Sequence, residues 1–234
     1  MLIQNMNWMQ VEAFLKTDDR IVLPIGSTEQ HGYLSLMTDA ILAQKVAEDA
    51  ATPLEVPVLP VMPFGLAPYF TAYPGTITLR TSTYFALIID ILNSVYHAGF
   101  RRILIVNGHG GNSPVLAEIQ DWLTHHTDAR VKLHNWWAAP KTMAKVKEID
   151  PVASHASWME NFPWTRIAGV ELPTTQKPMI DLEYMRQLGA NGVRDYVGDG
   201  NYGGDYFKDD QLMQTVWDTG VAETQEQLTN NWAD

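Results

Sequence analysis

The chain has 234 residues, no cysteine, and 27 acidic against 16 basic side chains, which gives a formal net charge of −11. Without thiols, disulfide scaffolds, thiolate zinc sites and iron–sulfur clusters are excluded, so any metal must be bound by His, Asp or Glu. The acidic excess repels a phosphate backbone, and no apolar run reaches the roughly 18 to 20 residues of a spanning helix, so we expect neither a nucleic-acid partner nor a membrane.

The overall composition is that of a globular domain, with 46% hydrophobic and 18% charged residues. We expect a single domain over residues 1–234, because a chain of this length can enclose one hydrophobic core. Its first residues contain neither a basic nor an apolar signal region, so the expected location is the cytoplasm.

The first half of the chain alternates between short apolar runs and helical patterns. Residues 21–25 form a β-branched run typical of a buried strand, and residues 39–51 carry apolar side chains at helical spacing. Residues 56–61 are a second apolar run, broken by prolines, and a loop rich in Gly, Pro and Tyr follows. Helical periodicity returns over residues 83–98 and stops at Gly99, a residue favoured at helix C-termini.

The second half begins with the clearest strand of the chain, residues 102–106, which is followed by a glycine-rich loop over residues 107–112. The pattern then predicts a helix over residues 115–125 and a strand over residues 131–137. A long glycine-rich loop precedes a final helix, expected over residues 209–232.

Strands that alternate with helices, each strand too apolar to have a solvated face, indicate an α/β fold with a mainly parallel central sheet flanked by helices. Ligands of such sheets bind at the carboxyl ends of the strands. The loops holding residues 29–39 and 107–112 both begin where a predicted strand ends. Their polar side chains are therefore candidates for one shared site.

Four of the seven histidines have ordinary structural explanations. His97, His125 and His126 lie near the ends of predicted helices, where the helix dipole favours a cation. His134 lies in a predicted strand beside two tryptophans and is either a buried core residue or part of a pocket wall.

Glu29 and His31 directly follow a strand, and in an extended segment residues i and i+2 point to the same side. The next acid, Asp39, opens the following helix, where it is either a ligand or, with Thr38, part of an N-cap. These three side chains are candidate metal ligands.

His109 stands inside Asn-Gly-His-Gly-Gly-Asn at the end of the best strand. A phosphate-cradling turn is the alternative there, but no Lys or Arg follows as a P-loop requires, so a metal ligand is favoured. His155 and Glu160 lie five residues apart in a segment rich in Trp and Met, and the alternative is a helix capped by Ser154.

Two histidines and three carboxylates suit two divalent ions that share one carboxylate, with His155 left to move protons. Zinc and manganese both accept imidazole together with carboxylate oxygen. Such a pair acidifies a water molecule and polarises a substrate oxygen, which is the chemistry of a hydrolase. The candidate ligands are Glu29, His31, Asp39, His109 and Glu160.

The chain resembles the creatininase (creatinine amidohydrolase) family in five segments that occur in the family's order. They are residues 23–32 (LPIGSTEQHG), Thr38-Asp39, residues 73–76 (YPGT), residues 107–112 (NGHGGN) and residues 155–160.

This resemblance implies a creatininase-like three-layer sandwich, assembled as a homohexamer, with two divalent ions in each chain, zinc, manganese or one of each. By position, the resemblance implies that Glu29 and His109 would bind one ion. His31 and Glu160 would bind the other, and Asp39 would bridge the two. His155 would be the catalytic proton-transfer residue.

Two departures from the family pattern bear on the substrate. Residues 32–37 are one residue shorter than the usual segment and lack both of its prolines and its extra His. Gly111 stands where creatininase itself has a Glu two residues after the second-motif His. Many family members without that Glu have one in the third motif, where this chain has Glu160. The chain is therefore expected to be a relative of creatininase rather than creatininase itself.

The expected activity is the opening of a small cyclic amide or a related C–N bond by a metal-activated water. The alternative keeps the metal site and changes the substrate to a formamide, a peptide or the ring C–C bond of a diketo-inositol (3-dehydro-scyllo-inosose hydrolase type). A third hypothesis is a non-catalytic, metal-stabilised binding protein. The candidate pocket residues are Tyr33, Tyr73, Gly110, Trp136, Trp137, Trp158 and Trp164. About half of the aromatic residues among them are expected to lie in the core instead.

Overall fold

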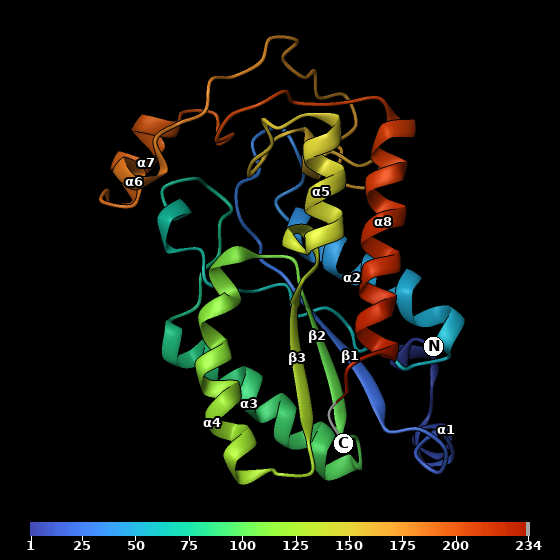
Figure 1. Cartoon of the computed structure of the whole chain (residues 1–234). Helices are drawn as coiled ribbons and strands as arrows, with labels where there is room; N and C mark the ends of the chain where they lie inside the picture. The colour runs from blue at the N-terminus through green and yellow to red at the C-terminus, as the bar shows by residue number, and fades with distance from the viewer. Residues whose placement is uncertain (233–234) are drawn as a thin grey trace.

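A computed structural model describes residues 1–232 and has a three-stranded parallel sheet at its centre (Figure 1). The strands are β1 (Arg20–Ile25), β2 (Arg102–Asn107) and β3 (Arg130–Asn135), in that order across the sheet. They pair residue for residue from Arg20 beside Arg102 to Ile25 beside Asn107, so their carboxyl ends are level. The predicted α/β fold with a parallel sheet is confirmed.

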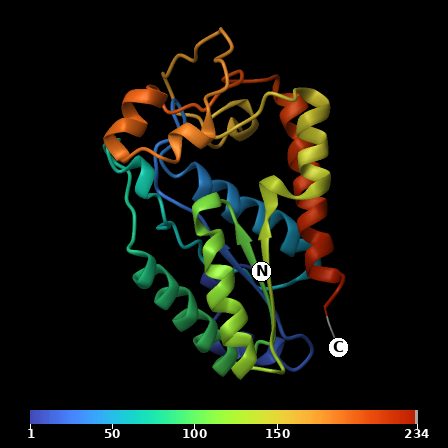
Figure 2. The ribbon, with the colours of Figure 1, turned by 60° about the vertical axis from the view of Figure 1, so that its left-hand side comes forward.

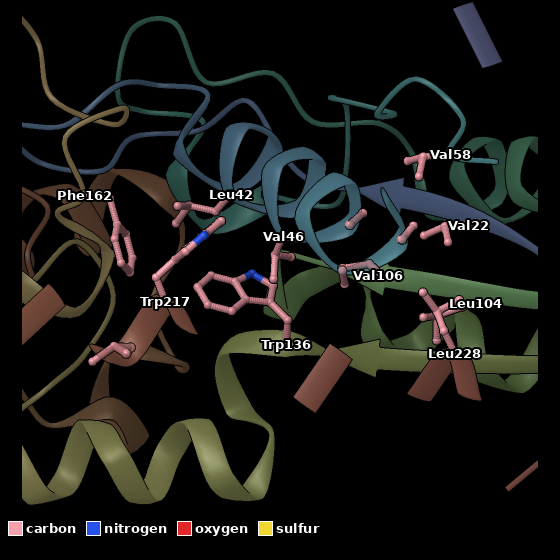
Figure 3. Close-up of a cluster of buried hydrophobic side chains, with 14 of the residues drawn as sticks. Val22, Leu42, Val46, Val58, Leu104, Val106, Trp136, Phe162, Trp217 and Leu228 are labelled. Atoms are coloured by element: carbon pink, nitrogen blue, oxygen red, sulfur yellow. The ribbon is translucent and has the colours of Figure 1, made fainter. Parts of the chain in front are cut away.

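One face of the sheet is covered by α2 (Thr38–Ala51), α5 (Pro140–Ile149) and α8 (Asp210–Thr229). Val22 of β1 points into this layer, as do Leu104 and Val106 of β2. Figure 3 shows Trp136 and Val106 beside Val46 of α2, with Val22 and Leu104 further along the strands and Trp217 toward Phe162.

The opposite face is covered by α3 (Thr81–Ala98) and α4 (Leu116–His125). The residues that alternate with those of the first face, Ile21, Leu23 and Ile25 of β1 among them, point into this second cluster. β1 and β2 are thus buried on both sides, which is why their sequences are almost continuously apolar, whereas most residues of β3 are only partly buried. The result is the expected sandwich of three layers, visible in Figure 2.

Smaller elements complete the chain. The short α-helices are α1 (Trp8–Phe14), α6 (Leu182–Met185) and α7 (Ala190–Val197). The 3-10 helices are Ile3–Asn5, Thr52–Leu54, Pro68–Phe70, Gly110–Val115, Trp136–Ala138 and Trp158–Glu160. Of the helices that the structure describes, none combines the length and apolar character needed to cross a membrane.

Three predicted segments differ from the structure in kind or end at least two residues early. The run over residues 56–61 forms only isolated bridges beside β1, such as Val58 to Val22, because its prolines lack the N–H that a continuous ladder requires. The strand predicted over residues 131–137 ends at Asn135, and the two tryptophans that follow turn into a 3-10 helix. The last helix ends at Thr229, before the predicted residue 232.

The arrowheads of β2 and β3 point toward the end of the molecule where α6 and α7 lie (Figure 2). A third, smaller cluster lies at that end, with Phe70, Met185, Val193 and Val197 at its centre. The carboxyl ends of the strands are therefore covered by segments that belong to neither main core.

Candidate metal centre

Two glycines bring the strand ends against the first turn of α2, which carries Asp39. A Cβ on Gly108, just after β2, would overlap the Asp39 carbonyl oxygen, and one on Gly26, just after β1, would lie 2.5 Å from the Ala40 Cα atom. Only glycine permits this approach. It places the loops that leave β1 and β2 on either side of the Asp39 carboxylate.

His109 is held with one ring nitrogen toward the acids. Its Nε2 atom lies 2.9 Å from the Leu66 carbonyl, which can only accept, so Nε2–H donates there. The other nitrogen, Nδ1, lies 2.9 Å from Asp39 Oδ2 and 3.3 Å from Glu29 Oε1. A Cβ on Gly111 would overlap both Leu66 O and the His109 ring, which explains why this position is glycine and has no room for a carboxylate side chain.

The two asparagines of the same loop fix its path. Asn107 Oδ1 accepts from the His109 backbone N–H at 3.0 Å, and Asn112 Nδ2 donates to the Gly26 carbonyl at 3.0 Å. The Leu66 backbone N–H in turn donates to Asn112 Oδ1 at 3.2 Å. The loop is thereby tied to β1 and to the segment that orients His109.

His31 faces the other oxygen of the same carboxylate. Its Nδ1–H donates to the Glu29 carbonyl at 3.2 Å, which leaves Nε2 3.0 Å from Asp39 Oδ1 and 3.8 Å from Glu160 Oε2. Glu160 ends a 3-10 helix and turns inward, where its Oε2 accepts from the Ala156 backbone N–H at 2.6 Å.

The structure therefore brings all five predicted ligands together. Their ligand atoms form the groups Glu29–Asp39–His109 and His31–Asp39–Glu160, each within 4.8 Å, with Asp39 in both. A third combination, Glu29–His31–His155, also meets this limit.

Three polar atoms at the centre of this cluster, Glu29 Oε1, His31 Nε2 and Asp39 Oδ2, are buried and face only other members of the cluster, so that no hydrogen bond satisfies them unless the imidazoles are protonated. Buried polar atoms normally have partners, and each imidazole already spends its other nitrogen on a carbonyl, the arrangement that orients metal-bound histidines. The donor set thus fits divalent cations.

Charge in the cluster is balanced by protons when no cation is bound. Burial alone would lower the pKa of His31, but the carboxylates of Asp39, Glu160 and Glu29 outweigh it and raise that pKa to about 10. The pKa of His109 is likewise well above its usual value, against burial, because of Glu29 and Asp39. Burial, reinforced by Asp39 and Glu29 against the opposing effect of His31, raises the pKa of Glu160 to about 7.

His155 lies beside this cluster, with its ring 4.5 Å from that of His31 and its Nδ1 atom 3.9 Å from Glu29 Oε1. Phe70 stacks on the imidazole at 4.9 Å. Burial, together with the positive charge of His31, holds the pKa of His155 well below its usual range.

Gln30 positions His155 and was not predicted from the sequence. Its side-chain amide nitrogen lies 2.8 Å from His155 Nε2 and 3.2 Å from the Gly200 carbonyl, while its Oε1 accepts from the Gly32 backbone N–H. The signal available was its place between two ligands, since in an extended segment it must point away from Glu29 and His31.

A cavity of about 440 Å³ opens over the cluster, a volume within the range of small-molecule sites. Glu29, Asp39, His109, His155 and Glu160 line its inner end, whereas His31 lies behind them. The other lining side chains are mostly apolar or aromatic and include Tyr69, Phe70, Trp137, Met143, Met159, Met179, Leu182, Met185 and Tyr202, together with Arg186.

Only some of the predicted pocket residues line this cavity. Gly110 and Trp137 line the cavity. Trp136 and Trp158 belong to the core instead, because Trp136 packs 5.5 Å from Trp217 and the Trp158 indole donates to the Val152 carbonyl.

The remaining predicted aromatics also lie outside the lining residues. Tyr33 packs edge-on against Tyr206, Tyr73 packs against Phe70, and Trp164 stacks on Phe162. Residue type alone does not reveal which way an aromatic side chain points: Trp136 and Trp158 point into the core, and a substrate contact by Tyr33 or Tyr73 stays a prediction.

Comparison with known proteins gives matches along the chain. A sequence model of the creatininase family, described as creatinine amidohydrolase, matches residues 4–226. A 3-dehydro-scyllo-inosose hydrolase from Thermotoga maritima is 27% identical over 148 residues, which are 62% of this chain and 48% of that protein. A creatinine amidohydrolase from Pseudomonas putida is 25% identical over 162 residues, 64% of this chain and 62% of that enzyme. The matches span less than two thirds of either relative.

Solved structures share the fold. A creatinine amidohydrolase (creatininase) superposes with a TM-score of 0.77 over 96% of this chain and 95% of its own, at 20% identity. Other solved creatininases at 20% identity include one named as a Zn–Zn type, with a TM-score of 0.75, and one named as a manganese form, with a TM-score of 0.76.

The Gly111→Ala substitution is expected to lower the affinity for Zn²⁺ by about tenfold or more, because the added methyl displaces either the Leu66 carbonyl or the His109 ring. Gly110→Ala is the matched control, since a Cβ there meets only the Trp137 ring at 3.6 Å. Competition with a chromophoric chelator measures both affinities. Equal affinities of the two variants would show that the Leu66 contact does not orient His109.

Metal uptake is expected to release protons at about pH 8, because the pKa of His31, about 10, leaves that imidazole protonated there, and Glu29 and Asp39 shift the pKa of His109 in the same direction. Titration calorimetry in two buffers of different ionisation enthalpy measures the number released. A value near zero would mean that both imidazoles are neutral in the metal-free protein.

Proposed function

The chain belongs to the creatininase family, and on that premise we propose that it is a dinuclear metal-dependent hydrolase that opens a small cyclic amide or a related C–N bond. The observation that carries the proposal is the position of Asp39, whose Oδ2 faces His109 Nδ1 and whose Oδ1 faces His31 Nε2. Glu29 and His109 would hold one ion, and His31 and Glu160 the other.

Zinc or manganese suits this set of imidazole nitrogens and carboxylate oxygens. Solved creatininases named as Zn–Zn and manganese forms support the same choice. Divalent ions held by these ligands supply Lewis acidity, which polarises a carbonyl and acidifies water.

His155 is the residue best placed to move protons. It lies at the inner end of the cavity, and its low pKa leaves the imidazole neutral. Because Gln30 holds Nε2, Nδ1 is the nitrogen that would exchange protons with water and substrate. In the overall hydrolysis the water oxygen bonds to the carbonyl carbon, the C–N bond breaks, and the proton passes through His155 to the leaving nitrogen. Gln30 holds the His155 ring, and Phe70 covers its face.

The second candidate keeps the site but acts on a formamide, or on the ring C–C bond of a diketo-inositol as the name of the Thermotoga maritima relative suggests. The cavity wall weighs against a polyol, because side chains such as Phe70, Met143 and Met159 offer few partners for hydroxyl groups. A flat ring of mixed polarity, with its polar edge toward the ligands, fits this wall better.

We also infer a homohexameric assembly, by analogy with the family, and α1 offers a surface for it because Trp8 is 71% and Met9 53% exposed. Sedimentation of the purified protein as a monomer would contradict this assembly. The cytoplasmic location stays a prediction of the sequence.

The metal-loaded protein is expected to contain close to two divalent ions per chain and to hydrolyse members of a panel of lactams, formamides and cyclic polyols, with products identified by mass. Asp39→Asn should lose most of the metal and all turnover, because it weakens both ion sites at once. His155→Gln should keep the metal and lower kcat by about 10²-fold or more.

His134→Gln is the matched control for His155, because His134 is also a buried imidazole but bonds Thr224 away from the cavity. It should retain both metal and kcat. Full turnover by His155→Gln would refute the proton-transfer role, and unchanged metal content in Asp39→Asn would refute the shared carboxylate.

A further inference from the structure

The cavity has one cationic side chain other than histidine among the described residues that line it, and this is Arg186. The acids of the lining, Glu29, Asp39 and Glu160, all belong to the ligand cluster at its inner end. Of these acids, Glu29 and Asp39 are buried. Other lining side chains are exposed, among them Met179, which is 45% exposed, and Arg186. Arg186 therefore lies on the solvent side of the cavity, remote from the ligands.

The Arg186 guanidinium has no hydrogen-bond or ion-pair partner within residues 1–232. Other cations at the same end of the molecule do have acidic partners, since Lys177 pairs with Asp199 and Lys208 with Asp150. Arg186 differs from the other unpaired cations among the described residues, such as Lys16 and Arg80, because it lines the cavity. A guanidinium left unpaired at the mouth of a cavity is available to a ligand.

Arg186 is also held in a defined position relative to the ligand cluster. Asp181 caps the N-terminus of α6, and the Arg186 backbone N–H donates to the Leu182 carbonyl at the end of that helix. The preceding residue, Met185, is buried in the cluster that contains Phe70, and Phe70 stacks on the His155 ring. One packed group thus connects the cavity mouth to the proton-transfer residue.

We propose that Arg186 is a specificity-determining residue that binds a carboxylate at the end of the substrate remote from the metal ligands. The substrate class is then a small amphipathic anion, with the hydrolysed bond at the ligand cluster, an apolar body against Met179 and Leu182, and a negatively charged end at Arg186. The planar fork of arginine matches a carboxylate with two parallel hydrogen bonds. The inference rests on the proposed function, because it assumes that the reacting bond lies at the metal site.

Binding of bifunctional probes tests this without requiring turnover. The probes are linear hydroxamates of graded chain length, whose hydroxamate binds zinc and whose far end is either a carboxylate or the matching carboxamide. Affinities for the zinc-loaded protein are measured by calorimetry for the wild type, Arg186→Gln, Arg186→Lys and Arg80→Gln. Arg80 is an exposed arginine outside the cavity, so its variant has the same net charge as Arg186→Gln.

At the best chain length the wild type and Arg80→Gln are expected to prefer the carboxylate by about fivefold, as for a partly exposed ion pair. Arg186→Gln should lose this preference, and Arg186→Lys should retain part of it. Equal binding of the two probes by the wild type, or an unchanged preference in Arg186→Gln, would overturn the role of Arg186 alone. Failure of every hydroxamate to bind would overturn the metal site as well and is thereby distinguishable.

Discussion

The carboxylate of Asp39 is the interaction on which the candidate site depends. It is buried at the first turn of α2, and its two oxygens face the imidazoles of His31 and His109 from opposite sides. Burying a carboxylate so deeply is costly unless cations compensate it. Either protonated imidazoles or divalent ions can supply that positive charge. The same residues can therefore hold protons in the metal-free protein and bind metal ions in the loaded one.

The sheet brings three segments of the chain together at this carboxylate. β1 and β2 end level with each other, and Gly26 and Gly108 let the loops that leave them touch the first turn of α2. Two independent cores, one on each face, keep the strands rigid, whereas the cavity mouth is formed by segments outside both cores. This division allows the ligands to be fixed while the mouth varies with the substrate.

Much of this could be predicted from the sequence because strand and ligand signals are local. β1 and β2 are continuous apolar runs, and Glu29, His31 and His109 follow them directly. What could not be predicted depends on contacts between distant segments. Trp136 turns into the core because Gly220 and Trp217 of α8 leave room for it there, and Arg186 reaches the cavity only through the packing of Met185. No periodicity or motif in the neighbouring sequence indicates the direction of either side chain.

Anomalous X-ray diffraction from crystals of the zinc-loaded protein can show whether two metal ions share the Asp39 carboxylate. Two anomalous peaks are expected, one between Glu29 and His109 and the other between His31 and Glu160, with the Asp39 carboxylate between them. A single peak, or peaks that Asp39 does not contact, would contradict this arrangement.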